Sequence, residues 1–211
     1  MATALILVGS PRRSGNSATL AEAVRRGADA TGTCATIRHL DDHVAHFLRD
    51  CRTCRRADGE CGIDDRYRSL FFDEFLAADA VVFCSPIYWY GLSAQTKAFL
   101  DRSFCYYAAS HPASRSVIER MAGKRIGLVL ASEESYPGAE LGIVHQVQEF
   151  VRYTRSRFVG CVRGVGNARG EIAKDPSDPV AAATRLGSEM FSRLYTDHRL
   201  ETPRSPRVWG D

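Results

Sequence analysis

Short apolar runs alternate with helical patterns along this chain, and this alternation constrains the fold more than any other feature. Each run is continuous, as in a strand that is buried on both faces of a sheet. Parallel strands need crossover connections, so the order predicts an α/β fold, a five-stranded parallel sheet with helices on both faces. The expected strands are residues 4–8, 33–40, 80–84, 125–131 and 157–163.

A helix is expected after each strand. The first begins near Ser17, which is placed to cap it, and ends at the small Thr31-Gly32 pair. The other helices are indicated by apolar residues at helical spacing in segments 70–78, 92–100, 141–151 and 186–194.

A chain of 211 residues is long enough to bury one core without metal or disulfide support. We expect one domain over residues 1–195, followed by an extended C-terminal tail over 196–211 that contains Pro203 and Pro206. Residues 41–64 have no clean period and carry three cysteines. They are expected to form an inserted loop.

Charge and hydropathy exclude two classes of partner. The formal net charge of +3 is small and evenly spread, so it does not indicate nucleic acid. No apolar run approaches the roughly 18–20 residues that span a bilayer, and Met1 leads into an apolar strand without a signal-peptide pattern. We therefore expect a cytoplasmic protein with neither a nucleic-acid nor a membrane partner.

The loop after the first strand has the composition of an anion site. Residues 9–17 read GSPRRSGNS, with small and hydroxyl residues, two arginines and then the start of a helix. Helix N-termini favour anions through free amides and the macrodipole. The loop lacks both the GxGxxG dinucleotide spacing and the lysine of a P-loop. It predicts a phosphate cradle of another kind, against the simpler alternative of a strand-to-helix turn.

Two further loops end at the same predicted sheet edge, where open α/β sheets bind ligands. Residues 85–91 read SPIYWYG, and such a loop suits a planar ring with polar edges. The alternative is that its aromatics belong to the core or to a subunit interface. The loop over 131–138 follows the fourth strand, and Ser132 is its expected contributor to the site.

These motifs resemble those of a known family. The GSPRRSGNS loop, the SPIYWYG loop and the run Lys97, Asp101 and Arg102 are similar to the NADPH-dependent FMN reductase-like flavoproteins, and especially to their iron–sulfur flavoprotein branch. The likeness covers about residues 4–135 and implies a flavodoxin-like fold that holds FMN. We expect the Lys97–Asp101 pair itself to be structural, as surface ion pairs usually are.

The resemblance also implies which residues bind the cofactor. It places Ser10, Arg12, Asn16 and Ser17 on the FMN phosphate, with Ser14 at a more variable position. It places Pro86, Ile87, Tyr88 and Trp89 against the flavin ring.

The function that this resemblance implies is electron transfer through bound FMN. We expect an enzyme that takes electrons from NADH or NADPH and passes them to a quinone, azo, nitro, flavin or other small acceptor. The cofactor supplies the chemistry, so no catalytic side chain is assigned. The alternative is an FMN-containing electron-transfer protein of the iron–sulfur flavoprotein type, without direct nicotinamide oxidation.

Three cysteines occur in the inserted segment as Cys51-x2-Cys54-x6-Cys61. Iron–sulfur flavoproteins carry a cluster on four cysteines in this region, but Ala57 stands where a third of four is expected. Free thiols are favoured; a cluster, a redox disulfide and a zinc site completed by His39, His43 or His46 are the alternatives. We expect no stable cluster and no metal.

The remaining four cysteines lie in apolar contexts, which predicts buried packing for Cys34, Cys84, Cys105 and Cys161. The stretch 104–109, FCYYAA, is rich in aromatics and too apolar to leave exposed on a monomer. It predicts a homodimer or homotetramer in which the neighbouring chain completes each flavin site.

Overall fold

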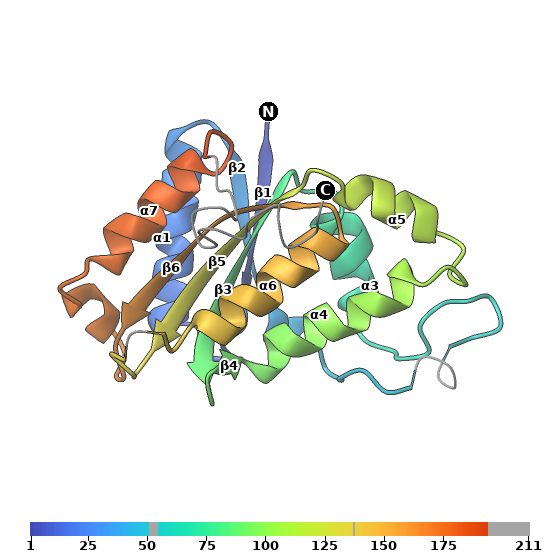
Figure 1. Cartoon of the computed structure of the whole chain (residues 1–211), viewed down its shortest axis with the longest axis horizontal. Helices are drawn as coiled ribbons and strands as arrows, with labels where there is room; N and C mark the ends of the chain where they lie inside the picture. Colours follow the sequence, from blue (N-terminus) through green and yellow to red (C-terminus); the bar gives the residue numbers. More distant parts are fainter. Residues whose placement is uncertain (51–54, 137, 194–211) are drawn as a thin grey trace, which may run out of the picture.

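The computed structural model describes residues 1–50, 55–136 and 138–193. Over these residues a parallel sheet with the order β2-β1-β3-β5-β6 lies between two layers of helices (Figure 1). All four neighbouring pairs are parallel, which confirms the predicted class and the five strands. The strands are β1 (Thr3–Val8), β2 (Cys34–His39), β3 (Ala80–Tyr88), β5 (Arg125–Ser132) and β6 (Arg157–Val165).

The two helical layers bury separate faces of the sheet. On one face lie α1 (Asn16–Ala30) and α7 (Pro179–Glu189). On the other lie α4 (Ala94–Tyr107), α5 (Ser114–Met121) and α6 (Leu141–Tyr153). The same layer contains the single turn α3 (Tyr67–Ser69) and the π-helical turn η2 (Leu70–Phe75), where Leu76 N–H donates to Phe71 O at 2.9 Å. Two 3-10 turns complete the elements, η1 (Leu40–Asp42) and η3 (Glu171–Lys174).

Several predicted boundaries are wrong. Helix α1 begins at Asn16 with Gly15 as its N-cap, and no side chain caps it, so Ser17 is not the cap. Leu92 lies in β4 (Gly91–Leu92), a short antiparallel partner of β3, and α4 begins only after Ser93. The sequence pattern missed α5, a short helix with charged residues at three of its eight positions. Leu194 and the tail over 196–211 lie outside the described residues.

Two expectations about apolar residues also need correction. Cys84 and Cys105 are buried as expected, but Cys34 is exposed on the edge strand β2 and Cys161 is only partly buried. In the aromatic stretch, Tyr106 and Tyr107 pack into the chain's own core, and Phe104 is the exposed ring. The burial of this stretch therefore does not require a second subunit. Among the described residues, no helix is both long and apolar enough to cross a membrane.

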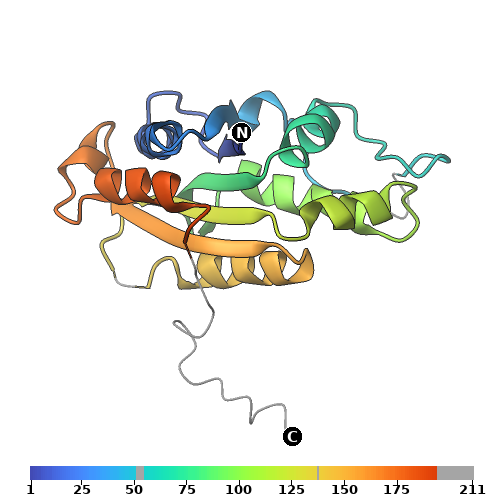
Figure 2. The same ribbon diagram turned by 90° about the horizontal axis from the view of Figure 1, so that it is seen from above.

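A buried ion pair fixes the end of the inserted segment, residues 41–64, to the core through the next residue, Asp65. Asp65 receives two hydrogen bonds from Arg102 on α4, at 2.5 Å and 2.8 Å, and both side chains are almost fully buried. The Arg102 guanidinium also lies over the Tyr67 ring, 4.2 Å from its centroid. Figure 2 shows the segment after residue 55 running beside α4 and α5. Arg102 therefore does not belong to the surface pair that Lys97 and Asp101 form at 2.6 Å.

The buried pair generates a stability prediction. Asp65→Ala should lower the free energy of unfolding by about 3–5 kcal/mol, because it leaves the Arg102 charge buried without its partner. The control is Asp101→Ala, which breaks an exposed pair one position earlier on α4 and should cost about 0–1 kcal/mol. Urea unfolding measures both, and equal losses would contradict the assignment.

The same pair predicts a pH dependence. Burial alone would raise the pKa of the Asp65 carboxyl, but the hydrogen bonds from Arg102 hold it below its usual value. A carboxyl with a lowered folded-state pKa stabilises the fold above its unfolded pKa, and that contribution disappears as the pH falls through the folded pKa. Unfolding in urea below pH 4 should therefore show less difference between the native chain and Asp65→Ala than unfolding at pH 7.

Gly9 allows a close approach between the first loop and α4. A Cβ atom at this position would lie 1.9 Å from Thr96 Oγ1 and 2.6 Å from Ser93 Oγ. Gly9→Ala should thus lower the free energy of unfolding by about 1–3 kcal/mol, as overpacking does. Gly142→Ala is the matched control, because nothing lies within 4 Å of its Cβ position in α6 and alanine favours a helix. Thermal unfolding that ranks Gly142→Ala as the less stable variant would contradict this.

Candidate functional site

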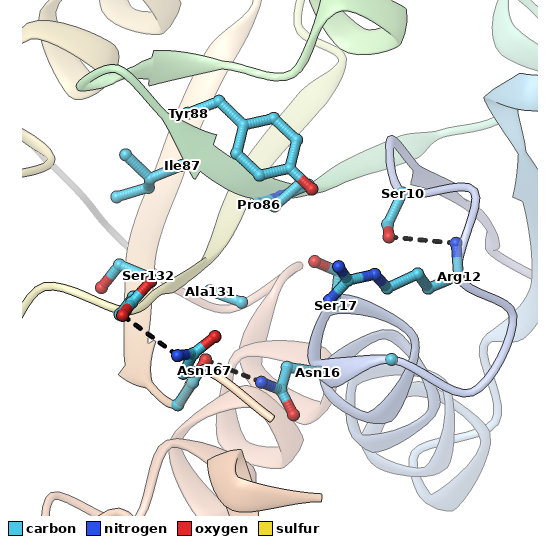
Figure 3. A pocket seen from close by; sticks show the side chains of 13 residues that line it. Ser10, Arg12, Asn16, Ser17, Pro86, Ile87, Tyr88, Ala131, Ser132 and Asn167 are labelled. Carbon is cyan, nitrogen blue, oxygen red and sulfur yellow. Dashed lines mark hydrogen bonds between the residues drawn. The ribbon is translucent and has the colours of Figure 1, made fainter. Parts of the chain in front are cut away.

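One pocket collects the loops at the carboxyl ends of the parallel strands (Figure 3). Its volume is about 230 Å³. The sheet order places the ends of β1, β3, β5 and β6 at this edge, which is where open α/β sheets bind ligands. It is lined by Ser10, Arg12, Gly15, Asn16, Ser17, Pro86, Ile87, Tyr88, Ala131, Ser132, Glu133, Gly166 and Asn167.

The N-terminus of α1 forms one wall. Its N-cap is Gly15, which has no side chain to accept from the first-turn amides, and residues in this turn line the pocket. The preceding loop is held by hydrogen bonds from Arg12 N–H to Ser10 Oγ at 3.2 Å and from Gly15 N–H to Arg12 O at 3.0 Å. A helix start without a cap offers N–H donors and a partial positive charge to an anion.

The two arginines of the first loop point to different places. Arg13 forms a bidentate pair with Asp42, at 2.6 Å and 2.7 Å, outside the pocket. Arg12 extends from the loop into the pocket (Figure 3). The pocket therefore receives one arginine charge, next to the start of α1.

Asn16 connects the first loop to the end of β6. Its Nδ2 donates to Gly166 O at 2.8 Å, while its Oδ1 is buried with no hydrogen-bond partner among the described residues. The side-chain amide thus holds two walls of the pocket together. Asn16 is also the first residue of α1.

The end of β3 forms the apolar wall. Pro86, Ile87 and Tyr88 line the pocket, and the Tyr88 ring extends from β3 toward the first loop (Figure 3). Behind them, Ser85 Oγ accepts from Ser93 N–H at 3.0 Å, which fixes the strand end against the start of α4. This wall offers an aromatic ring and aliphatic carbon beside backbone polar groups.

Trp89 and Tyr90 form the tip of the hairpin between β3 and β4. Both have positive φ angles, 50° and 57°, a conformation that costs energy for residues with side chains. The Trp89 side chain is 96% exposed and does not line the pocket. Ser14 also lies outside the lining, so the structure brings together eight of the ten predicted binding residues.

The other wall comes from the ends of β5 and β6. Ser132 is buried, and its Oγ donates to Glu134 O at 2.9 Å, so its hydroxyl shapes its own loop. Glu133 Oε1 accepts from Asn167 Nδ2 at 3.0 Å across the pocket floor. The predicted binding residues omitted this contribution from β6, namely Gly166 and Asn167. The polar GNARG segment after the fifth strand was the available signal, because it ends at the same sheet edge.

The inserted segment does not form a metal site within the part of the chain that is described. There, no three or more His, Cys, Asp or Glu side chains gather as metal ligands do. His39 Nδ1 lies 3.4 Å from Ser10 O, close to the first loop. Cys51 and Cys54 lie outside the described residues.

Known proteins are similar to this chain in sequence. A Bacillus subtilis protein provisionally named NAD(P)H-dependent FMN-containing oxidoreductase YwqN is 26% identical over 181 residues, which cover 86% of this chain and 94% of that protein. The iron-sulfur flavoprotein of Archaeoglobus fulgidus is 26% identical over 197 residues, 92% of this chain and 81% of that protein.

Solved structures agree on the fold. The Trp repressor binding protein of Bacillus subtilis superposes with a TM-score of 0.64 at 22% identity, over 92% of this chain and 99% of that one. The family model described as "Flavodoxin-like fold" matches residues 2–181. The parallel sheet with the order β2-β1-β3-β5-β6 agrees with this description. The chain belongs to the flavodoxin-like family.

Proposed function

We propose that this protein binds FMN in the pocket at the carboxyl ends of the strands and is an NAD(P)H oxidoreductase. FMN held there would supply the redox chemistry, namely the transfer of electrons from a reduced nicotinamide to a second small molecule. The relatives named above as FMN-containing oxidoreductase and as flavoprotein support this, as does the FMN-dependent NADH:quinone oxidoreductase 2 of Pseudomonas aeruginosa, which is 28% identical over 188 residues.

The start of α1 is the observation that carries the proposal. A phosphate there would accept hydrogen bonds from the uncapped backbone N–H groups of the first helical turn, and the Arg12 guanidinium would add charge-assisted hydrogen bonds. Ser10 and Ser17 are buried in the same loop and helix turn, and they supply further polar atoms. These donors fit a phosphate monoester and would have no partner in an unphosphorylated ligand.

The apolar wall fits the ring end of the same ligand. Pro86, Ile87 and Tyr88 offer face contacts, and the strand ends offer backbone donors and acceptors. The pocket volume of about 230 Å³ is below the roughly 300–1,000 Å³ of pockets that enclose a whole ligand of this size. One edge of the ring would then remain at the surface, where a nicotinamide and an acceptor can reach it in turn.

The lining residues also fit a protein that leaves the chemistry to its cofactor. They include no His, Cys or Lys, and the single carboxylate, Glu133, is hydrogen-bonded to Asn167. The chain's residues would bind and orient the cofactor and shield one of its faces. The proposed acceptors are a quinone, an azo compound, a nitro compound or a free flavin. Each of them can accept electrons without a protein acid at a fixed position.

The second candidate is an electron-transfer flavoprotein that does not oxidise nicotinamide, which the Archaeoglobus relative favours. Anaerobic mixing of the FMN-loaded protein with NADH or NADPH separates the two. If the protein is an NAD(P)H oxidoreductase, the absorbance of oxidised flavin should disappear within the time of one turnover and return when a quinone is added. A flavin that stays oxidised with both nucleotides, but is reduced by dithionite, would reject the proposal that the protein is an NAD(P)H oxidoreductase.

Iron and sulfide analysis should find far less than one cluster per chain.

The phosphate assignment predicts a difference between FMN and riboflavin. Arg12→Ala should weaken FMN binding about tenfold or more, since a hydrogen bond to a charged group contributes about 1.5–3 kcal/mol, and should leave riboflavin binding nearly unchanged. Arg13→Ala is the matched control, because Arg13 is paired with Asp42 outside the pocket. Quenching of flavin fluorescence measures all four affinities. An equal loss for both ligands would remove Arg12 from the phosphate site.

We also propose that the active unit is a homodimer or homotetramer in which the neighbouring chain covers the exposed edge of the flavin site. Tyr88, Trp89 and Tyr90 at the hairpin are exposed beside the pocket and fit an interface, where aromatic residues are enriched. Light scattering of the FMN-loaded protein should give at least twice the 23.3 kDa of one chain. A fully active protein at the mass of one chain would reject the proposal.

A further inference from the structure

A second cavity lies at the amino ends of β3 and β5, at the opposite edge of the sheet from the proposed FMN pocket. Its volume is about 340 Å³. The end of α5, which Figure 1 shows at this end of the sheet, forms part of its wall. The cavity is lined by Leu76, Ala77, Ala78, Asp79, Arg120, Ala122, Gly123, Lys124, Arg125 and Phe191. The two pockets share no lining residue.

Lys124 is the buried cation of this cavity and is only 5% exposed. Its Nζ donates to Leu76 O at 3.3 Å and also to Ala78 O. Neither of these carbonyl acceptors carries a charge. An ammonium group has three N–H donors, so one donor remains after the two bonds are made.

Two arginines line the same cavity. Arg120, near the end of α5, donates from Nη2 to Phe72 O at 3.2 Å, and Arg125, the first residue of β5, donates from Nη1 to Arg193 O at 3.4 Å. None of the ion pairs that join described residues includes Arg120, Lys124 or Arg125. Three cations therefore share one cavity, and each is hydrogen-bonded to a neutral carbonyl.

The carboxylate of the cavity, Asp79, is directed to another partner. It accepts hydrogen bonds from the N–H and the hydroxyl of Thr3, at 2.8 Å and 3.0 Å. Burial lowers the pKa of Lys124, Asp79 raises it and the charge of Arg120 lowers it again, to about 8. Lys124 is thus mainly an ammonium at pH 7. A buried charge without a counter-ion is costly, and an anion in the cavity would offset that cost.

The remaining walls of the cavity are mostly apolar. They include Leu76, three alanines and the partly buried ring of Phe191. The volume of about 340 Å³ falls within the roughly 300–1,000 Å³ of small-molecule sites, which combine apolar walls with a few polar groups. These features fit a small molecule with an anionic group and an apolar body.

We propose that this cavity binds a small organic carboxylate, whose anionic group accepts hydrogen bonds from Lys124 and Arg120 while its apolar body lies against Phe191. The inference does not depend on the proposed function, because the two pockets lie at opposite edges of the sheet. The alternative is that Lys124 only caps the carbonyls that follow η2.

Calorimetry on the full-length chain tests the proposal with benzoate as the probe and with excess FMN present to fill the other pocket. Benzoate should bind with a Kd of about 1 mM or tighter. Benzamide keeps the ring but has no charge, so it should bind about tenfold or more weakly. The absence of benzoate binding would overturn the proposal, and so would equal affinity for benzamide. Inorganic phosphate that binds as tightly as benzoate would overturn the assigned class of ligand.

A pair of variants on α5 tests the site. Arg120→Ala should weaken benzoate binding about fivefold or more, because it removes one charged donor from the cavity. Arg115→Ala is the matched control, since it removes the same charge from the same helix at an exposed residue that pairs with Glu119 outside the cavity. An equal loss in both variants would indicate only general attraction to positive charge and would overturn the proposal.

Lys124→Met tests the buried cation and should weaken benzoate binding about tenfold or more. Circular dichroism establishes whether this variant is folded, and the two arginine variants decide the matter if it is not. Amide chemical shifts of the native chain locate the probe independently: benzoate should shift residues 76–79 and 122–125. Shifts confined to residues 10–17 and 86–88 would place benzoate in the other pocket and overturn the proposal.

Discussion

The burial of parallel strands on both faces is the constraint on which the rest of this structure depends. Strands that run the same way need a helix between each pair, and those helices must cover both faces. The consequence is that β1, β3, β5 and β6 all deliver their carboxyl ends to one edge. Residues from four loops meet there although they are far apart in the chain; Asn16 and Gly166, for example, are separated by 150 positions. The pocket is therefore a product of the sheet's connectivity.

A second constraint holds the inserted segment. It has too few apolar residues to form a core of its own, and Asp65 anchors it through a buried ion pair with Arg102. A buried pair adds little net stability compared with apolar packing, but it penalises every arrangement that leaves one charge alone. This penalty fixes the register of the segment against α4.

The sequence predicted much of the site because its motifs are local. A loop that follows a buried strand and precedes a helix must lie at the sheet edge, which is why Ser10, Arg12 and Ser17 were found to line the pocket. Trp89 lies outside the pocket lining for a geometric reason. The hairpin reverses the chain at this residue, and its positive φ turns the side chain to solvent, a change that alternation along a strand does not reveal.

The sequence by itself determined the five strands, the parallel class of the sheet and the two main loops of the site. It could do so because hydrophobic periodicity and loop composition are properties of neighbouring residues. Only the tertiary structure decided that Asn167 faces Glu133, and that Arg102 is a buried partner of Asp65 while Lys97 and Asp101 stay outside. These contacts join side chains far apart in the chain, and their partners are chosen by packing and by the cost of burying an unpaired polar group.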